Sequence, residues 1–291
     1  MYAGIEAGGT KWVCAVGTGP DDLTAETTFP TTTPQETLGR MADFLREHEA
    51  RLDAVGIASF GPVDLDASSP TYGSITSTPK SGWNGADVVG AARDAVDMPI
   101  GFDTDVNGAA LGEGRWGAAK GLDTFVYVTV GTGIGGGGVV RGELLHGLLH
   151  PEMGHLLVRH AEGDDFAGVC PYHGDCLEGM AAGPALKQRW GRLAEELEDD
   201  LEAALELQAS YLGQLATALT LTLSPQLIIL GGGVMKLPGL VERVRDETVA
   251  LLGGYIDVPA VTKETDSYIV IPGLGDRAGV LGAIALAERA A

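Results

Sequence analysis

The sequence predicts an α/β protein with two similar halves, and two observations lead to this fold class. Short apolar runs typical of strands alternate with segments of helical periodicity along the 291 residues. Twice, two apolar runs are joined by a glycine-rich turn, at Gly8–Gly9 and at 131–138, as in a strand–turn–strand hairpin. Strand hairpins interleaved with helices indicate a layered α/β architecture.

The other elements are predicted in chain order from the same patterns. We expect helices at 34–51, 87–96, 106–115, 240–252 and 277–289, strands at 54–60, 100–103 and 226–230, and a mostly helical stretch from 181 to about 223 whose acidic, exposed part is 195–206. The most apolar window, 211–234, has the length of a membrane helix. Ser224–Pro225 and Gly231–Gly233 interrupt it, so we interpret it as helix, turn and strand.

The length allows two domains, but no long linker rich in proline or serine separates them. We therefore predict two tightly joined domains with a boundary near 116–121. The small α/β domain is expected at 1–118 and the large α/β domain at 119–276.

The composition excludes several classes of partner. The chain carries 40 acidic and 19 basic residues, a net charge of −21, whereas nucleic acids and anionic membranes need concentrated positive charge. This balance favours either a high-salt cytoplasm, where screening lets carboxylates crowd together, or an ordinary acidic cytosolic protein. Three cysteines cannot form a disulfide framework, and Cys14 lies in a run typical of a buried strand. The N-terminus lacks the features of a signal peptide, so we expect a soluble, cytoplasmic protein.

Three glycine clusters are candidate phosphate-binding loops, because their backbone amides are not shielded by side chains. The residues are Gly8, Gly9, Thr10 and Lys11, then Gly131, Thr132, Gly133 and Gly135, and finally Gly231, Gly232 and Gly233. The first two are neither a Walker A motif nor a dinucleotide-binding loop. The alternative is that these two are plain hairpin turns, and the presence of three such clusters in one chain weighs against it.

Residues 102–107 (FDTDVN) place two carboxylates and an amide at the end of a strand, just before a helix. A carboxylate there can accept a proton from a hydroxyl nucleophile as a general base. The competing interpretation is an N-cap, in which the side chain accepts a hydrogen bond from the first helical turn. The cap can be Asp103 or Thr104, which leaves Asp105 as the candidate base.

The segment GVCPYHGDC contains Cys170, His173 and Cys176 at spacings of three, and this pattern indicates a zinc site. His155 is the favoured fourth ligand, with His150, His160 and Cys14 as weaker candidates. Four protein ligands would make the site structural. The alternative is a loop with two free cysteines and a surface histidine.

These motifs, in this order, resemble the ROK family of sugar kinases, whose fold is the two-domain actin-like, hexokinase-like ATPase fold (ribonuclease H-like). The resemblance runs from GIEAGGTK near the N-terminus to GDRAGVLGA near the C-terminus. Its most specific part is EMGH followed by C-x₂-H-x₂-C-L-E-G, which looks like the family's zinc signature. The histidine in that signature, HPEMGH before it, and Glu6 where an aspartate is usual are most similar to the fructokinase branch.

The resemblance implies a role for each matched residue. Asp105 becomes the catalytic base, and the first two glycine clusters become phosphate loops, while Gly231–Gly233 bind the nucleotide. The implied sugar-binding residues are Gly61, Pro62, Thr104, Asp105, Glu152, His155 and Glu178, and the implied zinc ligands are His155, Cys170, His173 and Cys176. Thr104 stands where the family commonly has asparagine, and the loop beginning at Gly61–Pro62 matches only in part. The last helix, about 277–291, is expected to pack back on the small domain.

The resemblance therefore implies an ATP-dependent hexose kinase, with fructose favoured and fructose 6-phosphate as product. ATP, Mg²⁺ and structural Zn²⁺ are the expected cofactors, and a homodimer is the expected assembly. The alternatives are a glucokinase or another kinase of hexoses or N-acyl hexosamines, a non-catalytic sugar- or zinc-binding protein, and a sugar-responsive regulator of this family. Such regulators carry a DNA-binding helix-turn-helix before the first glycine loop, where this chain has five residues ahead of Glu6.

Overall fold

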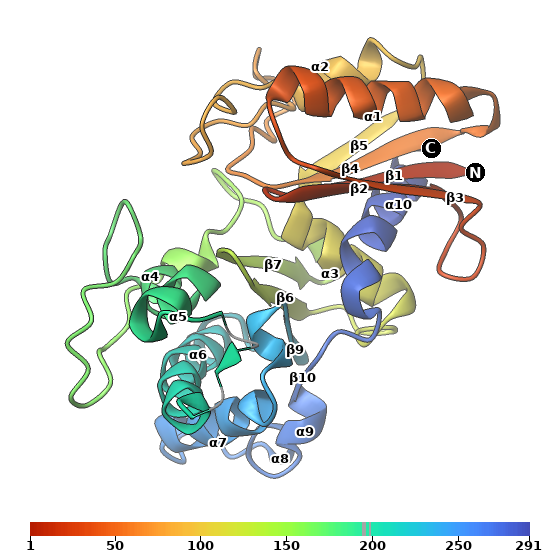
Figure 1. Ribbon diagram of the computed structural model, residues 1–291. Coiled ribbons are helices and arrows are strands. Elements are labelled where there is room, and N and C mark those ends of the chain that lie inside the picture. The colour runs from red at the N-terminus through yellow and green to blue at the C-terminus, as the bar shows by residue number, and fades with distance from the viewer. Residues whose placement is uncertain (194–195, 198) are drawn as a thin grey trace. The chain divides into compact units, whose positions relative to one another are not determined.

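The computed structural model describes all residues except 194–195 and 198. The chain forms two compact units. Unit 1 consists of Met1–Gly121, Leu144–His150 and Asp276–Ala291, and unit 2 of Leu122–Glu143 and Pro151–Gly275. Two five-stranded mixed sheets and their helices make up the fold, which is the predicted α/β class (Figure 1).

The elements follow one another in the order that the sequence predicts, with several short additions. The strands are β1 (Tyr2–Ala7), β2 (Lys11–Gly17), β3 (Ala25–Pro30), β4 (Ala54–Ser59), β5 (Ile100–Thr104), β6 (Phe125–Val130), β7 (Ile134–Val140), β8 (Glu143–Leu144), β9 (Leu227–Gly231) and β10 (Ile269–Val270). The α-helices are α1 (Pro34–His48), α2 (Val88–Arg93), α3 (Asp105–Trp116), α4 (Leu177–Ala181), α5 (Gly183–Trp190), α6 (Leu201–Leu223), α7 (Leu240–Leu252), α8 (Pro259–Thr262), α9 (Thr265–Tyr268) and α10 (Ala278–Ala290). Short 3-10 turns include η1 (Glu49–Arg51), η2 (Met153–His155), η4 (Val234–Lys236) and η5 (Gly275–Arg277).

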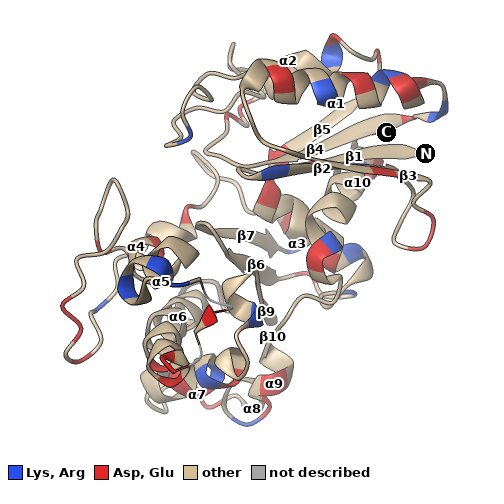
Figure 2. Ribbon diagram, in the orientation of Figure 1, with Lys and Arg blue, Asp and Glu red and all other residues tan. Residues whose placement is uncertain are grey.

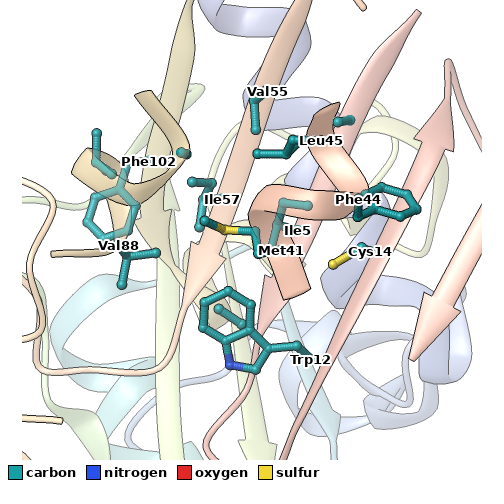
Figure 3. Packing of buried hydrophobic residues seen from close by; sticks show 14 of the residues in the cluster. Ile5, Trp12, Cys14, Met41, Phe44, Leu45, Val55, Ile57, Val88 and Phe102 are labelled. Carbon is teal, nitrogen blue, oxygen red and sulfur yellow. The ribbon is translucent and has the colours of Figure 1, made fainter. Parts of the chain in front are cut away.

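The sheet of unit 1 has the strand order β3-β2-β1-β4-β5. β1 and β2 form the predicted antiparallel hairpin, with Ile5 opposite Cys14, and β1, β4 and β5 run parallel. One face of the sheet packs against α1 and α2 in a core whose members include Trp12, Met41, Leu45, Ile57, Val88 and Phe102 (Figure 3). Cys14 is fully buried in β2, as its apolar surroundings predict.

Helix α10 lies against the other face of this sheet, where missing side chains allow a close approach. A Cβ atom at Gly56 in β4 would lie 1.8 Å from the carbonyl oxygen of Ala283 in α10. A Cβ at Gly282 in α10 would likewise lie 1.8 Å from the carbonyl oxygen of Gly108 in α3. Because only glycine fits at these contacts, the closing helix packs directly on β4 and on α3, the helix that begins at Asp105.

The sheet of unit 2 has the order β10-β9-β6-β7-β8. β6 and β7 form the second predicted hairpin, and β6, β9 and β10 run parallel. The predicted turn at 131–138 is too long, because Ile134–Val140 is a strand and Gly135–Gly138 pair with β6. β-propensity would not have placed four glycines in a strand, and the pairing with β6 overrides it.

The stretch from 181 to about 223 is mostly helical among its described residues, as predicted, and contains α5 and α6. α5 ends at Gly191, whose φ of 68° is the left-handed conformation that ends helices. Residues 195 and 198 of the predicted acidic segment lie outside the described residues. α6 ends at Ser224 and β9 follows, which confirms the interpretation of the apolar window as helix, turn and strand. Among the described residues, no helix combines the length and apolarity needed to cross a membrane.

Candidate active site and metal centre

The first glycine cluster forms the turn between β1 and β2. The Gly8 N–H donates to the Lys11 carbonyl oxygen (3.1 Å), which closes the turn. Thr31, which directly follows β3, also holds this turn. Its hydroxyl donates to the Gly8 carbonyl (2.7 Å), and its N–H donates to the Thr10 carbonyl (2.9 Å). Thr10 and the cation of Lys11 are exposed. The turn thus combines a fixed backbone with a hydroxyl and an ammonium group, which are groups that bind phosphate.

The junction of β5 and α3 places the candidate base at the first residue of the helix. Thr104 is the N-cap, and its hydroxyl accepts from the Asn107 N–H (3.1 Å). The Asp105 carboxylate accepts from the N–H of Val106 (2.9 Å). Thr104 therefore takes the capping role that the sequence left open between Asp103 and Thr104.

The loop that begins at Gly61–Pro62 contacts a histidine that comes much later in the chain. The peptide bond between Gly61 and Pro62 is cis. The following Val63 N–H donates to Nε2 of His150 (3.1 Å), which is buried. The sequence makes His150 only a weak candidate for a zinc ligand, and it is not part of the Cys/His cluster that the structure brings together.

Sequence reasoning missed one histidine beside the candidate base. Nε2 of His146 lies 2.9 Å from Oδ2 of the buried Asp103, two residues before Asp105. The hydrogen bond to Asp103 raises the pKa of His146 above its ordinary value. His146 and Asp103 are 43 positions apart, so no local pattern could have joined them.

The second glycine cluster, in unit 2, is tied to a predicted sugar-binding carboxylate. The Gly131 N–H donates to the Gly133 carbonyl (2.8 Å), which closes the turn between β6 and β7. Oε2 of Glu178 accepts from the Ile134 N–H (2.9 Å), and a Cβ at Gly133 would lie 2.7 Å from the same oxygen. Glycine at 133 thus leaves the space that this carboxylate oxygen occupies.

Glu152 and His155 lie beside this carboxylate on and next to η2. Burial raises the pKa of Glu152, and the negative charge of Glu178 raises it further, while the charge of His155 lowers it. A neighbouring charge shifts a pKa mainly within about 4–6 Å, so His155 and Glu178 are electrostatic neighbours of Glu152. A partly buried acid with a raised pKa is typical of functional sites.

The third glycine cluster follows β9 in unit 2. Gly232 has a φ of 93°, and a Cβ there would lie 2.3 Å from the Val130 carbonyl at the end of β6. At Gly231 a Cβ would meet the hydroxyl of Tyr127 at 2.8 Å. The bare backbone thus turns tightly beside the second glycine loop, as a nucleotide-binding turn would.

The four predicted zinc ligands gather in unit 2. The candidate donor atoms of His155, Cys170, His173 and Cys176 all lie within 4.8 Å of one another. Nδ1 of His155 is 3.5 Å from Sγ of Cys176 and 3.8 Å from Sγ of Cys170, and Nδ1 of His173 is 3.7 Å from Sγ of Cys170. Zinc bonds of about 2.0–2.3 Å give tetrahedral donor–donor distances of about 3.3–3.8 Å, so this Cys₂His₂ set fits zinc.

The knuckle has the backbone of a small hairpin. Cys170 and Gly174 exchange both backbone hydrogen bonds, at 2.9 and 3.1 Å. Cys176 then begins α4, so Glu178 stands only two residues beyond a ligand. Burial raises the pKa of the Cys176 thiol to about 11, so a thiolate at this position requires a cation beside it.

The loop between η2 and the knuckle is anchored by a buried ion pair. Arg189 of α5 binds both carboxylate oxygens of Asp164, at 2.6 and 2.7 Å, and Tyr211 of α6 donates to the same carboxylate. The guanidinium also stacks over the ring of Phe166, 4.0 Å from its centroid. The loop that joins His155 to Cys170 is therefore fixed to the helices of unit 2.

Acidic residues outnumber basic residues by 40 to 19 in this chain. Acidic side chains are present on helices of each unit, among them α1, α3 and α6, while basic residues are fewer and scattered (Figure 2). The rare cation Lys11 stands beside a glycine turn. Its placement suits an anionic ligand.

Comparison with known proteins defines the class to which this fold and these residues belong. The chain belongs to the ROK family, whose model matches residues 2–290. It is 45% identical over 290 residues to a putative fructokinase of Bacillus subtilis, covering 100% of this chain and 96% of that protein. It is 46% identical over 293 residues to a fructokinase of Zymomonas mobilis, covering 99% and 96%. The crystal structure of a ROK hexokinase from Thermus thermophilus has a TM-score of 0.79 and 27% identity, covering 99% of this chain and 98% of the hexokinase. These findings confirm the predicted family and fold.

Proposed function

We propose that this protein is an ATP-dependent fructokinase that converts D-fructose to fructose 6-phosphate. The observation that supports this most directly is identity of 45–46% to fructokinases over nearly the full length of both chains. Further support is that Asp105 begins α3, that glycine turns join β1 to β2 and β6 to β7, and that Glu178 lies in α4.

In the proposed mechanism Asp105 accepts the proton of the attacking sugar hydroxyl. That oxygen then bonds to the γ-phosphorus of ATP and ADP leaves. The bare amides of the glycine turns and the cation of Lys11 bind the phosphate oxygens, which carry most of the charge during phosphoryl transfer. Mg²⁺ enters with the nucleotide as part of the substrate. Glu152, His155 and Glu178 orient the sugar.

The metal centre has a structural role in this proposal. His155, Cys170, His173 and Cys176 would hold Zn²⁺, and the bound ion would cross-link η2 to the start of α4 as a structural site. Each of these elements carries a proposed sugar-binding residue or adjoins one. The four ligands thereby fix the sugar-binding side chains in unit 2.

A sugar panel tests the substrate. ADP release is measured with ATP and fructose, glucose, mannose or an N-acyl hexosamine, and fructose is expected to give the highest kcat/KM. A pocket built to hydrogen-bond particular hydroxyls rejects sugars that lack them by large factors. A higher kcat/KM with glucose would overturn the fructose assignment and favour the glucokinase alternative. Release without any sugar requirement would overturn the kinase itself.

The same panel run at low and at high KCl tests adaptation to salt. We propose that screening relieves repulsion within the net charge of −21, so stability and activity rise with salt. A fall in activity on adding KCl would indicate an ordinary acidic cytosolic enzyme.

Light scattering in the same buffers tests the homodimer, which has twice the chain mass of 30.1 kDa.

A further inference from the structure

A histidine from a distant segment pairs with a carboxylate at the base of helix α3. The segment Leu144–His150 belongs to unit 1, although it follows the second hairpin in the chain. Its His146 places Nε2 2.9 Å from Oδ2 of Asp103. The Asp103 side chain is only 4% exposed and that of His146 is 39% exposed. Burying a carboxylate without a partner costs free energy. The contact with His146 offsets part of this desolvation cost for Asp103.

The carboxylate of Asp103 is held on its other side as well. Its Oδ1 accepts from the Thr104 N–H (2.8 Å) and from Nδ2 of Asn107 (2.7 Å). Asp103 therefore joins His146 to both ends of the first turn of α3. Because an ionised carboxylate only accepts hydrogen bonds, Nε2 of His146 must carry the proton in this contact.

Asn107 completes the set of donors around the Asp103 carboxylate. Its Nδ2 lies 3.2 Å from Nε2 of His146, and its buried Oδ1 has no hydrogen-bond partner. Both nitrogens are donors in this arrangement, so they share the Asp103 carboxylate as their acceptor and do not bond each other. Asn107 also donates its backbone N–H to the capping hydroxyl of Thr104.

The segment that carries His146 is anchored at both of its ends. Leu144 packs against Ala58 and Leu286 in unit 1, and His150 accepts from the Val63 N–H (3.1 Å). Between the two ends, Leu148 is 99% exposed and so contributes no packing. His146 is therefore the polar link from this segment to α3.

We propose that His146 is a positioning residue for phosphoryl transfer, which through Asp103 fixes the first helical turn and with it the carboxylate of Asp105. This inference rests on the proposed kinase function, in which Asp105 is the base. It deepens that function, because it explains how the base is held when the residue before it is threonine. Misplacing a reacting group by about 1 Å can cost about a hundredfold in rate.

The protonation state of His146 sets the strength of the link. Its pKa is raised first by the hydrogen bond to Asp103 and also by the charge of that carboxylate, while burial and the charge of Arg289 lower it. Tyr72 faces Asp103 as well, and burial raises the pKa of Tyr72. Because the folded pKa of His146 lies above its unfolded value, its contribution to stability is complete below the unfolded value and is lost as the pH rises through the folded one.

The kinetic test compares His146→Gln and His146→Ala with wild type across pH. We expect kcat of the wild type to fall as the pH rises through the pKa of His146. His146→Gln, which can donate but not ionise, should lack this limb. His146→Ala should lower kcat by about tenfold at neutral pH, with KM for ATP within about twofold. His48→Gln, on α1, is the control and should keep the wild-type profile.

A second measurement does not depend on turnover. In NMR titrations of the full chain, the pKa of His146 is expected to drop in Asp103→Asn, because the hydrogen bond to the carboxylate raises it. If sugar phosphorylation is absent in the wild type, the proposed function fails while this titration still tests the pair. An unchanged His146 pKa in Asp103→Asn, or an alkaline limb retained in a correctly folded His146→Gln, would overturn the positioning role. Thermal unfolding of each variant establishes the folding.

Discussion

At the scale of single residues, Glu178 has the most connections of the proposed sugar-binding side chains. It accepts the Ile134 N–H of the second glycine loop, and it lies two residues after Cys176 in the sequence. Its charge also raises the pKa of Glu152. Glu178 thus links the second glycine loop, the proposed sugar-binding residue Glu152 and the proposed metal centre within unit 2.

Replacing Glu178 separates its structural contact from its charge. Glu178→Ala leaves the buried Ile134 N–H unpaired, which costs about 1–3 kcal/mol, so its melting temperature should fall. Glu178→Gln keeps an acceptor oxygen and should remain closer to wild type in stability. Both should raise KM for the sugar. Glu206→Ala on the exposed face of α6 is the control, and a Glu178→Ala variant as stable as this control would contradict the structural role.

The sequence could predict the residues that act through their neighbours in the chain. The cap at the start of α3 followed from the short pattern of FDTDVN, and the structure assigns it to Thr104. The pairing of Asp103 with His146 could not be predicted, because it depends on a segment 43 positions away folding back onto unit 1. Similarly, the sequence around Gly133 could not predict that the Glu178 carboxylate lies where a side chain at 133 would be.

At the scale of elements, the knuckle at 168–176 was predictable because its ligands are close in sequence. Spacings of three residues in a loop leave few arrangements of the donor atoms. The structure places Nδ1 of His155, the favoured fourth ligand, 3.5 Å from Sγ of Cys176 and 3.8 Å from Sγ of Cys170. The four residues that the sequence selected are the four that gather.

Removing one ligand should release the metal. Cys176→Ser is expected to lose its zinc and to lower the melting temperature by several degrees, since metal binding contributes to folding. Metal content by mass spectrometry and thermal unfolding measure both effects. Cys14→Ala removes the third thiol without touching the site, so it should keep about one zinc per chain. Wild-type protein that contains no zinc and is unaffected by chelators would contradict the assignment.

The close packing of α10 predicts opposite effects on stability for Gly→Ala substitutions at two helical positions, Gly282 in α10 and Gly39 in α1. Gly282→Ala drives a methyl group into the backbone of α3, where the carbonyl oxygen of Gly108 would be 1.8 Å away. It should destabilise the protein by about 3 kcal/mol or more. Gly39→Ala in α1 meets nothing within 4 Å and should stabilise by about 0.5–1 kcal/mol. Equal effects in urea unfolding would contradict the close approach.

At the scale of the whole molecule, the alternation of elements predicted the fold class but not the composition of the units. Hairpins and helices are local, and their order followed from apolar periodicity and glycine turns. Membership of a unit depends on contacts between distant segments. The structure assigns both the closing helix and the short segment Leu144–His150 to unit 1, and the second of these has no signature in composition.

The central claim is that the chain is a sugar kinase in which Asp105 removes the proton. The most direct measurement is fructose-dependent ADP release by wild type and by Asp105→Asn, with the exposed Asp97→Asn as control. The amide has the shape of the carboxylate but cannot accept the proton, so kcat should fall by about 10²–10⁴-fold while the circular dichroism spectrum and melting temperature stay close to wild type. Wild-type turnover in a folded Asp105→Asn variant would contradict the account.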